Sequence, residues 1–215
     1  ANTLQVTRMA AQGQVETALE TLEALAASDG ASDARVQIAV VQARLNTGDS
    51  EGALSYAEEL VSGNPEDLRF LSTLAAVRMA IGDYVGAEAL YRELIQTQST
   101  EPQFWIGLMR VLNLQGRSEE TREVLDSALE ILPEALDLLW AQASYLEQLG
   151  NYEEAITIYE EMYALAPNAP VVANNLASLL STYRSDEASL ERAWTIARRL
   201  RGNDFPPFQD TYGWL

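Results

Sequence analysis

The sequence predicts an all-α solenoid, a linear stack of antiparallel helix hairpins, and three observations support it. First, apolar residues recur at helical spacing in runs separated by short breaks. Between Leu136 and Asn168, for example, two amphipathic runs flank Gly150 and end at Pro167. Second, glycines recur every 34 residues, at Gly48, Gly82, Gly116 and Gly150. Third, prolines keep the same spacing, at Pro65, Pro133 and Pro167. A fixed period of this length indicates stacked units that contact only their neighbours.

We expect one solenoid domain, residues 1–215, made of about six units. Residues 1–12 are the expected remnant of a first helix, and residues 15–27 form its hairpin partner. In the sixth unit, four extra residues are expected to lengthen the turn around Tyr183 to Asp186. The last helix begins a further unit and stops, so we expect a fragment of a longer array. The expected units are 1–33, 34–67, 68–101, 102–135, 136–169, 170–205 and the partial unit 206–215.

Residues at fixed offsets from each glycine predict how the two helices of a hairpin pack. Small residues come five positions later, where the second helix must pass close to the first: Ala53, Ala87, Thr121 and Ala155. Four positions further on are residues expected to fill the space between hairpins: Ala57, Tyr91, Leu125 and Tyr159. Close helix contacts at each repeat are therefore expected.

These positions resemble the tetratricopeptide repeat family, whose pattern is W-x2-L-G-x2-Y, then A-x3-F, then P. The matching segments are Trp105-x2-Leu108, Ala87-x3-Tyr91 and Ala155-x3-Tyr159. The small residue after the leucine is Ala75, Ala143, Ala177 or Gly213, whereas Val41 and Met109 depart from it. The resemblance covers nearly the whole chain and implies a right-handed superhelix of the multi-repeat, bacterial type.

The Asn174-Asn175-Leu176-Ala177 run and the Asp210 to Trp214 run further resemble late repeats of long bacterial arrays. Such arrays serve envelope polysaccharide export, pilus assembly or protein sorting. For a chain without cysteine, the bacterial cytoplasm and periplasm both remain open.

The charge balance excludes several classes of partner. Fourteen basic residues stand against 32 acidic ones, for a net charge of −18, which disfavours nucleic acid and anionic membranes. No apolar run reaches the roughly 18 residues that suggest a membrane span, and no signal segment opens the chain. With no Cys and no His, disulfides and thiolate or imidazole metal sites are excluded. We expect no cofactor.

The candidate catalytic motifs favour a protein that is not an enzyme. Gly48 to Gly52 reads G-x-S-x-G, but a hydrolase elbow needs a strand before it and a histidine base. Ser50 is therefore predicted to be a helix N-cap. Adjacent carboxylates recur, and we expect them on the solvated convex face: Glu58-Glu59, Glu119-Glu120, Glu153-Glu154 and Glu160-Glu161.

The resemblance implies that the first helix of each hairpin, helix A, lines a concave groove that binds a peptide. Residues predicted to face it are Arg35, Arg69, Gln103, Arg110, Trp140, Asn174 and Asn175. Arginine forks and a large aromatic anchor are typical of protein-binding sites, and the arginines favour an acidic partner. The alternative is that Arg35 and Arg69 cap helix starts and Trp140 packs on the next hairpin.

Two rival functions remain open. Exposed apolar ends, with Tyr212 and Trp214 at the last helix, favour a self-assembling structural array or a homodimer. Alternatively, the chain is the targeting or regulatory part of a longer enzyme or envelope-export protein. Our main hypothesis is a non-catalytic protein-protein interaction scaffold.

Overall fold

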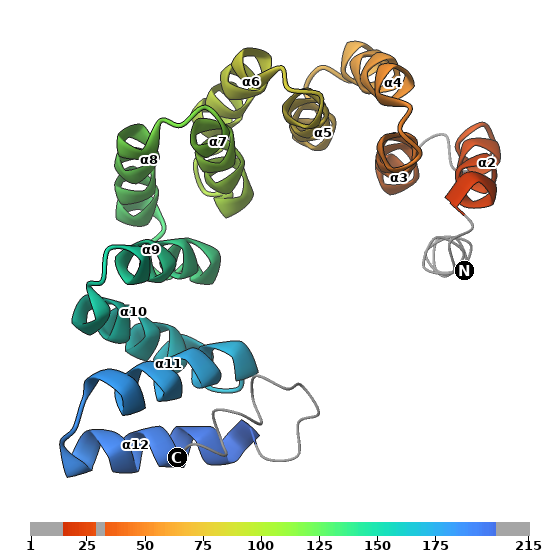
Figure 1. Cartoon of the computed structure of the whole chain (residues 1–215). Helices are drawn as coiled ribbons and strands as arrows, with labels where there is room; N and C mark the ends of the chain where they lie inside the picture. Colours follow the sequence, from red (N-terminus) through yellow and green to blue (C-terminus); the bar gives the residue numbers. More distant parts are fainter. Residues whose placement is uncertain (1–14, 29–32, 201–215) are drawn as a thin grey trace. The chain divides into compact units, whose positions relative to one another are not determined.

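The computed structural model describes residues 15–28 and 33–200, and every regular element in these ranges is helical (Figure 1). The helices are α2 (Val15–Ala26), α3 (Ala34–Asn46), α4 (Ser50–Gly63), α5 (Leu68–Ala80), α6 (Tyr84–Thr97), α7 (Pro102–Leu114), α8 (Ser118–Ile131), α9 (Leu136–Gln148), α10 (Tyr152–Leu165), α11 (Pro170–Tyr183), α12 (Glu187–Ala197) and the 3-10 helix η1 (Arg198–Leu200). The predicted all-α array of hairpins is confirmed. The helices expected in residues 1–12 and 206–215 lie outside the described residues.

The chain divides into two compact units, residues 1–124 and 125–215, with the boundary inside α8. Consecutive helices pack from α2 to α7 in the first unit and from α9 to α12 in the second. Packing only between neighbours in sequence is the property of a repeat array. That residues 1–215 act as one domain stays a prediction.

The hairpin turns depend on the four glycines of the 34-residue grid. Gly48, Gly82, Gly116 and Gly150 have φ of 84°, 86°, 73° and 76°, in the left-handed region that glycine enters without a steric penalty. The next helix then begins with an aspartate cap in two hairpins: Asp49 accepts from the Gly52 N–H, and Asp83 from the Gly86 N–H. The prediction that Ser50 is the N-cap is wrong. Asp49 holds that position, and Ser50 is the first residue of α4.

In the first unit, the A helices α3, α5 and α7 lie on the inner side of the stack and α4 and α6 on the outer side (Figure 1). Besides its hairpin contacts, α5 packs against both α3 and α7, whereas α4 and α6 do not pack closely on each other. The small residues predicted at the crossing points within the hairpins, Ala53 of α4 and Ala87 of α6, are fully buried. The A helices therefore converge on the concave face of this unit.

The second unit has one continuous core between α9 and η1. It contains the predicted small residue Ala155 and the large side chains Tyr159, Met162, Leu176 and Leu180, all with almost no exposed surface. Trp140, half-buried on α9, packs against this core. Six residues of α11 are buried in this core, whereas Val171 and Tyr183 at its two ends are 47% and 44% exposed.

The sixth hairpin corrects the prediction of a lengthened turn. Its connector is residues 184–186, as short as those of the other hairpins, because α11 continues to Tyr183 and α12 already begins at Glu187. Asp186 sets that early start by accepting a hydrogen bond from the Ser189 N–H at 2.9 Å. The four extra residues therefore lie within the helices rather than in the loop. Helix α11 extends one residue further beyond Ala177 than α9 does beyond Ala143, and α12 begins three residues further before Ala193 than α10 does before Ala155.

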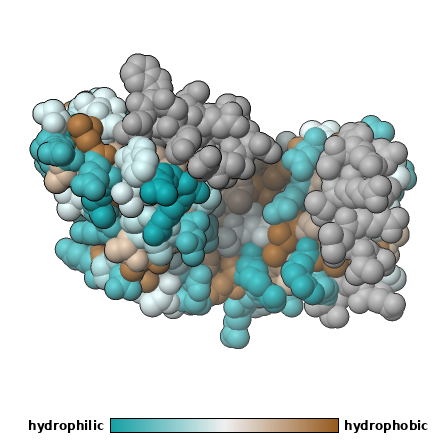
Figure 2. All heavy atoms as spheres, turned by 90° about the horizontal axis from the view of Figure 1, so that it is seen from below, coloured by the Kyte–Doolittle hydropathy of each residue, from teal (hydrophilic) through white to brown (hydrophobic). Residues whose placement is uncertain are grey.

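Most of the surface drawn in Figure 2 is hydrophilic, with hydrophobic residues scattered in small groups between hydrophilic ones. Large exposed hydrophobic side chains are spread over several helices, with Val85 of α6 at 79% exposure, and Leu190 and Trp194 lie one turn apart on α12. Scattered exposure of this kind is ordinary for a folded protein. Among the described residues, no helix is both long and apolar enough to cross a membrane.

Candidate functional site

Arg35 and Arg69 lie at the first turns of α3 and α5, where both are engaged by the capping aspartate two residues earlier. Asp67 Oδ1 accepts from the backbone N–H of Arg69 at 3.0 Å and from its Nε–H at 2.9 Å, and Oδ2 accepts from Nη2 at 2.6 Å. Asp33 makes the same three contacts with Arg35. The two arginine side chains remain 85% and 64% exposed. Each arginine is thus part of a helix cap while facing solvent.

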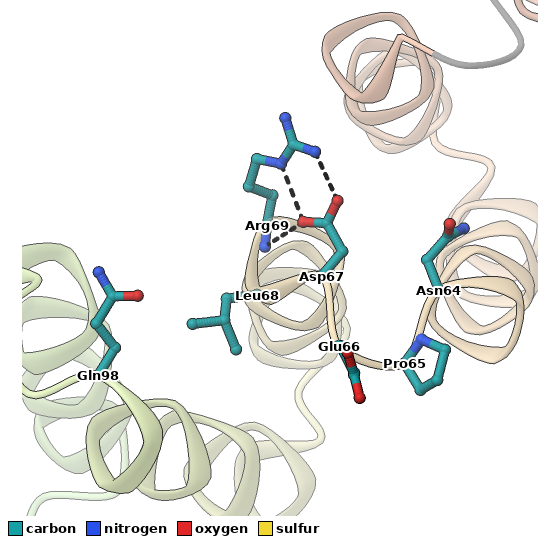
Figure 3. A pocket seen from close by; sticks show the side chains of 7 residues that line it. All are labelled: Asn64, Pro65, Glu66, Asp67, Leu68, Arg69 and Gln98. Atoms are coloured by element: carbon teal, nitrogen blue, oxygen red, sulfur yellow. Dashed lines mark hydrogen bonds and ion pairs between the residues drawn. The ribbon is translucent and has the colours of Figure 1, made fainter.

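The Asp67–Arg69 pair lines a depression of about 720 Å³ that is open to solvent (Figure 3). Its other lining residues are Asn64, Pro65, Glu66, Leu68 and Gln98. In Figure 3, Leu68 points towards Gln98, while the guanidinium lies over the Asp67 carboxylate. The hydrogen bonds from Arg69 hold the pKa of Asp67 below its usual value, so the pair stays ionised. The arginine charge here is already matched by a carboxylate.

Gln103 and Arg110 are both exposed on α7, and between them lies the buried Gly107. The ring of Tyr91 from α6 covers this glycine so closely that an added Cβ would lie 2.2 Å from Tyr91 Cε1. Arg110 follows Gly107 by one helical turn. Helix α7 therefore carries an exposed arginine one turn from the point where a tyrosine of α6 packs against it.

In the second unit, the three predicted residues Trp140, Asn174 and Asn175 gather around Tyr159 of α10. The Trp140 and Tyr159 rings meet edge to face with centroids 5.8 Å apart. Asn175 Nδ2 donates to the Tyr159 hydroxyl at 3.0 Å, and Asn174 Nδ2 donates to Asn175 Oδ1 at 3.3 Å. The Tyr159 hydroxyl in turn donates to Glu147 Oε1 at 2.8 Å. We call these five residues the α9–α11 cluster.

One atom of the α9–α11 cluster has no partner. Asn174 Oδ1 is buried and accepts no hydrogen bond within the described part of the chain. Burial raises the pKa of the Tyr159 hydroxyl to about 12, so this hydroxyl keeps its proton and its bond to Glu147 at neutral pH. A buried acceptor without a donor costs free energy, and a ligand N–H would remove that cost.

The adjacent carboxylates that the sequence analysis considered as candidate catalytic residues form ion pairs with arginines. At least one carboxylate of each pair contacts an arginine: Glu58 with Arg78, Glu119 with Arg122, Glu120 with Arg117, Glu153 with Arg184, and Glu160 with Arg192. No group of three or more metal-ligating side chains occurs within residues 15–28 and 33–200. Around Ser50 both flanks are helical, as predicted.

The structure thus brings Trp140, Asn174 and Asn175 together. Arg35 and Arg69 instead each belong to a separate helix cap, one repeat apart. Sequence reasoning treated Tyr91 and Tyr159 as space fillers and missed that their hydroxyls reach the A-helix side. The signal available in the sequence was that both tyrosines occupy the same position of the 34-residue repeat. Aligning the repeats at these two positions would have compared the residues around one tyrosine with those around the other.

The repeat pattern also matches a known family. The sequence profile of the tetratricopeptide repeat matches residues 38–102, and a second profile of the same repeat matches residues 136–179. The two matches fall in different compact units and together span half of the chain. The chain is a tetratricopeptide repeat protein.

Similar proteins agree on the TPR fold. Tetratricopeptide repeat protein 7B of Mus musculus is 35% identical over 75 residues, which is 35% of this chain and 9% of that protein. A tetratricopeptide repeat protein of Parabacteroides merdae has a TM-score of 0.57 at 15% identity, covering 98% of this chain and 82% of that one. A thermophilic TPR protein of Thermus thermophilus has a TM-score of 0.61 at 19% identity, covering 82% of this chain and 96% of that one.

This TPR chain spans about a tenth of the length of the curated relative, and the structural likenesses show the fold alone. TPR domains bind proteins or peptides and are generally non-catalytic scaffolds. A role in protein-protein interaction follows from the fold.

Proposed function

We propose that this TPR array is a non-catalytic scaffold that binds an extended protein segment along the inner faces of its A helices. The α9–α11 cluster is the proposed anchor in the second unit. Arg35, Arg69, Gln103 and Arg110 are proposed contacts in the first unit. Since packed helices hold these side chains in place, binding costs little conformational entropy on the side of the array.

The observation that carries the proposal is the unpartnered Asn174 Oδ1 beside the partly exposed Trp140. An extended segment offers a backbone N–H that can donate to this oxygen, together with a side chain that can pack on the indole. A hydrogen bond that fills a buried acceptor contributes about 1–3 kcal/mol. The α9–α11 cluster is therefore suited to bind a backbone N–H and an apolar side chain of the same segment.

The test is selection of short random peptides displayed on phage against the whole chain, followed by affinity measurement with synthetic versions. Trp140→Ala and Asn174→Leu should each weaken binding about tenfold or more. Trp194→Ala is the matched control, because Trp194 is 44% exposed on α12 of the same unit. Equal affinity of all three variants would reject the anchor, and failure to select any peptide would reject peptide binding.

Self-association is the second candidate, and one observation favours it. Leu190 and Trp194, 39% and 44% exposed, lie one turn apart on α12, the last α-helix of the described part. Burying such a pair in a second copy would remove apolar surface from water. Light scattering of the wild type and of Leu190→Glu would detect it as a mass that rises with concentration and falls in the variant. The earlier candidates Tyr212 and Trp214 lie outside the described residues.

A further inference from the structure

Tyr91 in the first unit and Tyr159 in the second occupy the same position of the repeat but have different neighbours. Tyr159 donates to Glu147 on the preceding A helix and accepts from Asn175 on the following one. Two repeats earlier, the residues equivalent to Glu147 and Asn175 are Met79 and Gly107. Neither side chain can accept the hydroxyl proton of Tyr91 in the way that Glu147 accepts that of Tyr159.

The Tyr91 hydroxyl consequently makes no hydrogen bond to any described residue, although the tyrosine as a whole is only 5% exposed. The two buried side-chain atoms without a partner in residues 15–28 and 33–200 are Arg78 Nε and Asn174 Oδ1. The hydroxyl oxygen is not one of them, so it reaches solvent. Gly107 leaves the room for this, since any Cβ there would collide with the Tyr91 ring.

Arg110 lies one turn beyond Gly107 and differs from the other arginines of the described part. Nine of those have an ion pair: Arg35, Arg44, Arg69, Arg78, Arg92, Arg117, Arg122, Arg184 and Arg192. Arg198 and Arg199 stack over aromatic rings. The exposed Arg110 guanidinium has neither kind of contact with any described residue. In a chain of net charge −18, an arginine without a carboxylate is the exception.

Helix α7 brings the two groups near each other, because the Tyr91 ring packs on Gly107 and Arg110 follows Gly107 by one helical turn. Burial raises the pKa of Tyr91, and the positive charge of Arg110 acts in the opposite direction. The Arg110 guanidinium and the Tyr91 O–H are therefore two neighbouring donors without an acceptor among the described residues. A carboxylate, with several lone pairs on two oxygens, can accept from both.

We propose that Arg110 and Tyr91 form a subsite for the carboxylate of an Asp or Glu side chain on the bound segment. This inference rests on the proposed peptide-binding function and adds the chemical class of one contact. The subsite supplies a single positive charge, which matches a singly charged carboxylate. A phosphate, with nearly two negative charges at neutral pH, would leave one charge unmatched in an already acidic protein.

The probes are the synthetic peptides selected as described above. Each is compared with versions in which every Glu or Asp in turn is replaced by Gln or Asn, or by phosphoserine. We expect selected peptides to contain an acidic residue whose replacement by the amide weakens binding about ten- to a hundredfold. Arg110→Gln should cause the same loss, and the two changes together should cost little more than either one. Tyr91→Phe, which keeps the ring on Gly107, should weaken binding about tenfold.

Two further variants test the subsite directly. Met79→Glu introduces a carboxylate at the position equivalent to Glu147, the residue that accepts from Tyr159. Its negative charge should abolish the preference of the array for peptides with an acidic residue. Met79→Leu is its neutral control and should bind as the wild type does. Arg92→Gln removes the same charge from the same unit, but Arg92 lies on α6 and pairs with Glu88, so affinity should not change.

Several results would overturn the subsite. Peptides that bind equally well to Arg110→Gln, to Tyr91→Phe and to the wild type would reject it while leaving the α9–α11 cluster intact. Tighter binding of phosphoserine than of glutamate would reject the carboxylate assignment. A selection that yields no peptide at all would reject the proposed function, and the subsite with it.

Discussion

Nη2 of Arg44 on α3 lies 2.7 Å from Oε1 of Glu23 on α2, and this ion pair joins two successive hairpins. One repeat further on, Arg78 of α5 contacts Glu58 of α4 at 3.2 Å. Both arginines occupy the same grid position, so the link is a repeated feature of the first unit. Arg44 also donates to the Gly52 carbonyl oxygen at 3.0 Å. The repeated pair helps to fix how one hairpin stacks on the next.

The Glu23–Arg44 pair should therefore show a measurable coupling. We expect a double-mutant cycle with Glu23→Gln and Arg44→Gln to give about 0.5–1 kcal/mol, because both side chains are partly exposed. Arg44→Gln alone should cost more than Glu23→Gln, since it also loses the bond to Gly52. Urea unfolding measures these free energies. Strict additivity of the two single changes would show that the contact contributes nothing.

Gly107 should tolerate no side chain. We expect Gly107→Ala to lower the free energy of unfolding by about 1–3 kcal/mol, because its Cβ would lie 2.2 Å from the Tyr91 ring. Gly63→Ala is the matched control. Gly63 is also helical, with open space around an added Cβ, so alanine there should stabilise by up to about 1 kcal/mol. If both variants were stabilised, the close approach of Tyr91 to α7 would be wrong.

The hairpins could be predicted because their determinants are local and periodic. A glycine in the left-handed turn, a small residue at the crossing point and a regular apolar pattern recur at fixed offsets, as at Gly82 and Ala87. The α12 start was not predictable by counting residues, since the position of the cap at Asp186 decided whether extra residues became loop or helix. Ser50 was misassigned for the same reason, because Asp49 is an equally good cap one residue earlier.

The candidate site was predicted only in part, for a different physical reason. Helical position places Trp140, Asn174 and Asn175 on the A-helix side, and the structure joins them through Tyr159. Whether an arginine is free or paired depends on rotamers and on residues from other helices, which periodicity does not contain. Arg69 is held by its own cap, whereas Arg110, assigned to the same groove, has no ion partner in the described part.

Acid should weaken the Asp67–Arg69 cap in a defined pH range. The Arg69 hydrogen bonds lower the pKa of Asp67 from its ordinary 3.8. The contribution of this carboxylate to stability is therefore complete above the ordinary value, and it is lost as pH falls below 3.8 towards the folded-state value. Asp67→Asn keeps a capping side chain but cannot titrate.

The stability difference between the wild type and Asp67→Asn should thus stay constant at higher pH and shrink below 3.8. Urea unfolding of both proteins across that range measures it, and the comparison cancels the effect of the other acidic groups. When both proteins also carry Arg69→Gln, the stability difference between the one with Asp67 and the one with Asp67→Asn should be smaller at every pH. A difference that does not depend on pH would show that Arg69 does not stabilise the ionised cap.

Alkali provides the corresponding test of the α9–α11 cluster. The pKa of Tyr159 rises from 10.0 to about 12, chiefly because burial disfavours the phenolate. The unfolded chain ionises this hydroxyl near its ordinary value, while the folded chain keeps it protonated until about pH 12. The hydroxyl therefore stabilises the fold fully below pH 10, and this stabilisation is lost as pH rises through the folded-state value.

Tyr159→Phe should consequently cost about 1–2 kcal/mol at neutral pH, because Glu147 and Asn175 lose a partner in a partly buried place. Between pH 10 and about 12 the variant should approach the wild type in stability, since it has no hydroxyl to ionise. Tyr91→Phe is the control at neutral pH. Its hydroxyl has no protein partner, so its removal should change stability by less than about 0.5 kcal/mol. Equal costs for the two tyrosines would mean that the bonds of Tyr159 contribute no stability, and the cluster would lose its structural basis.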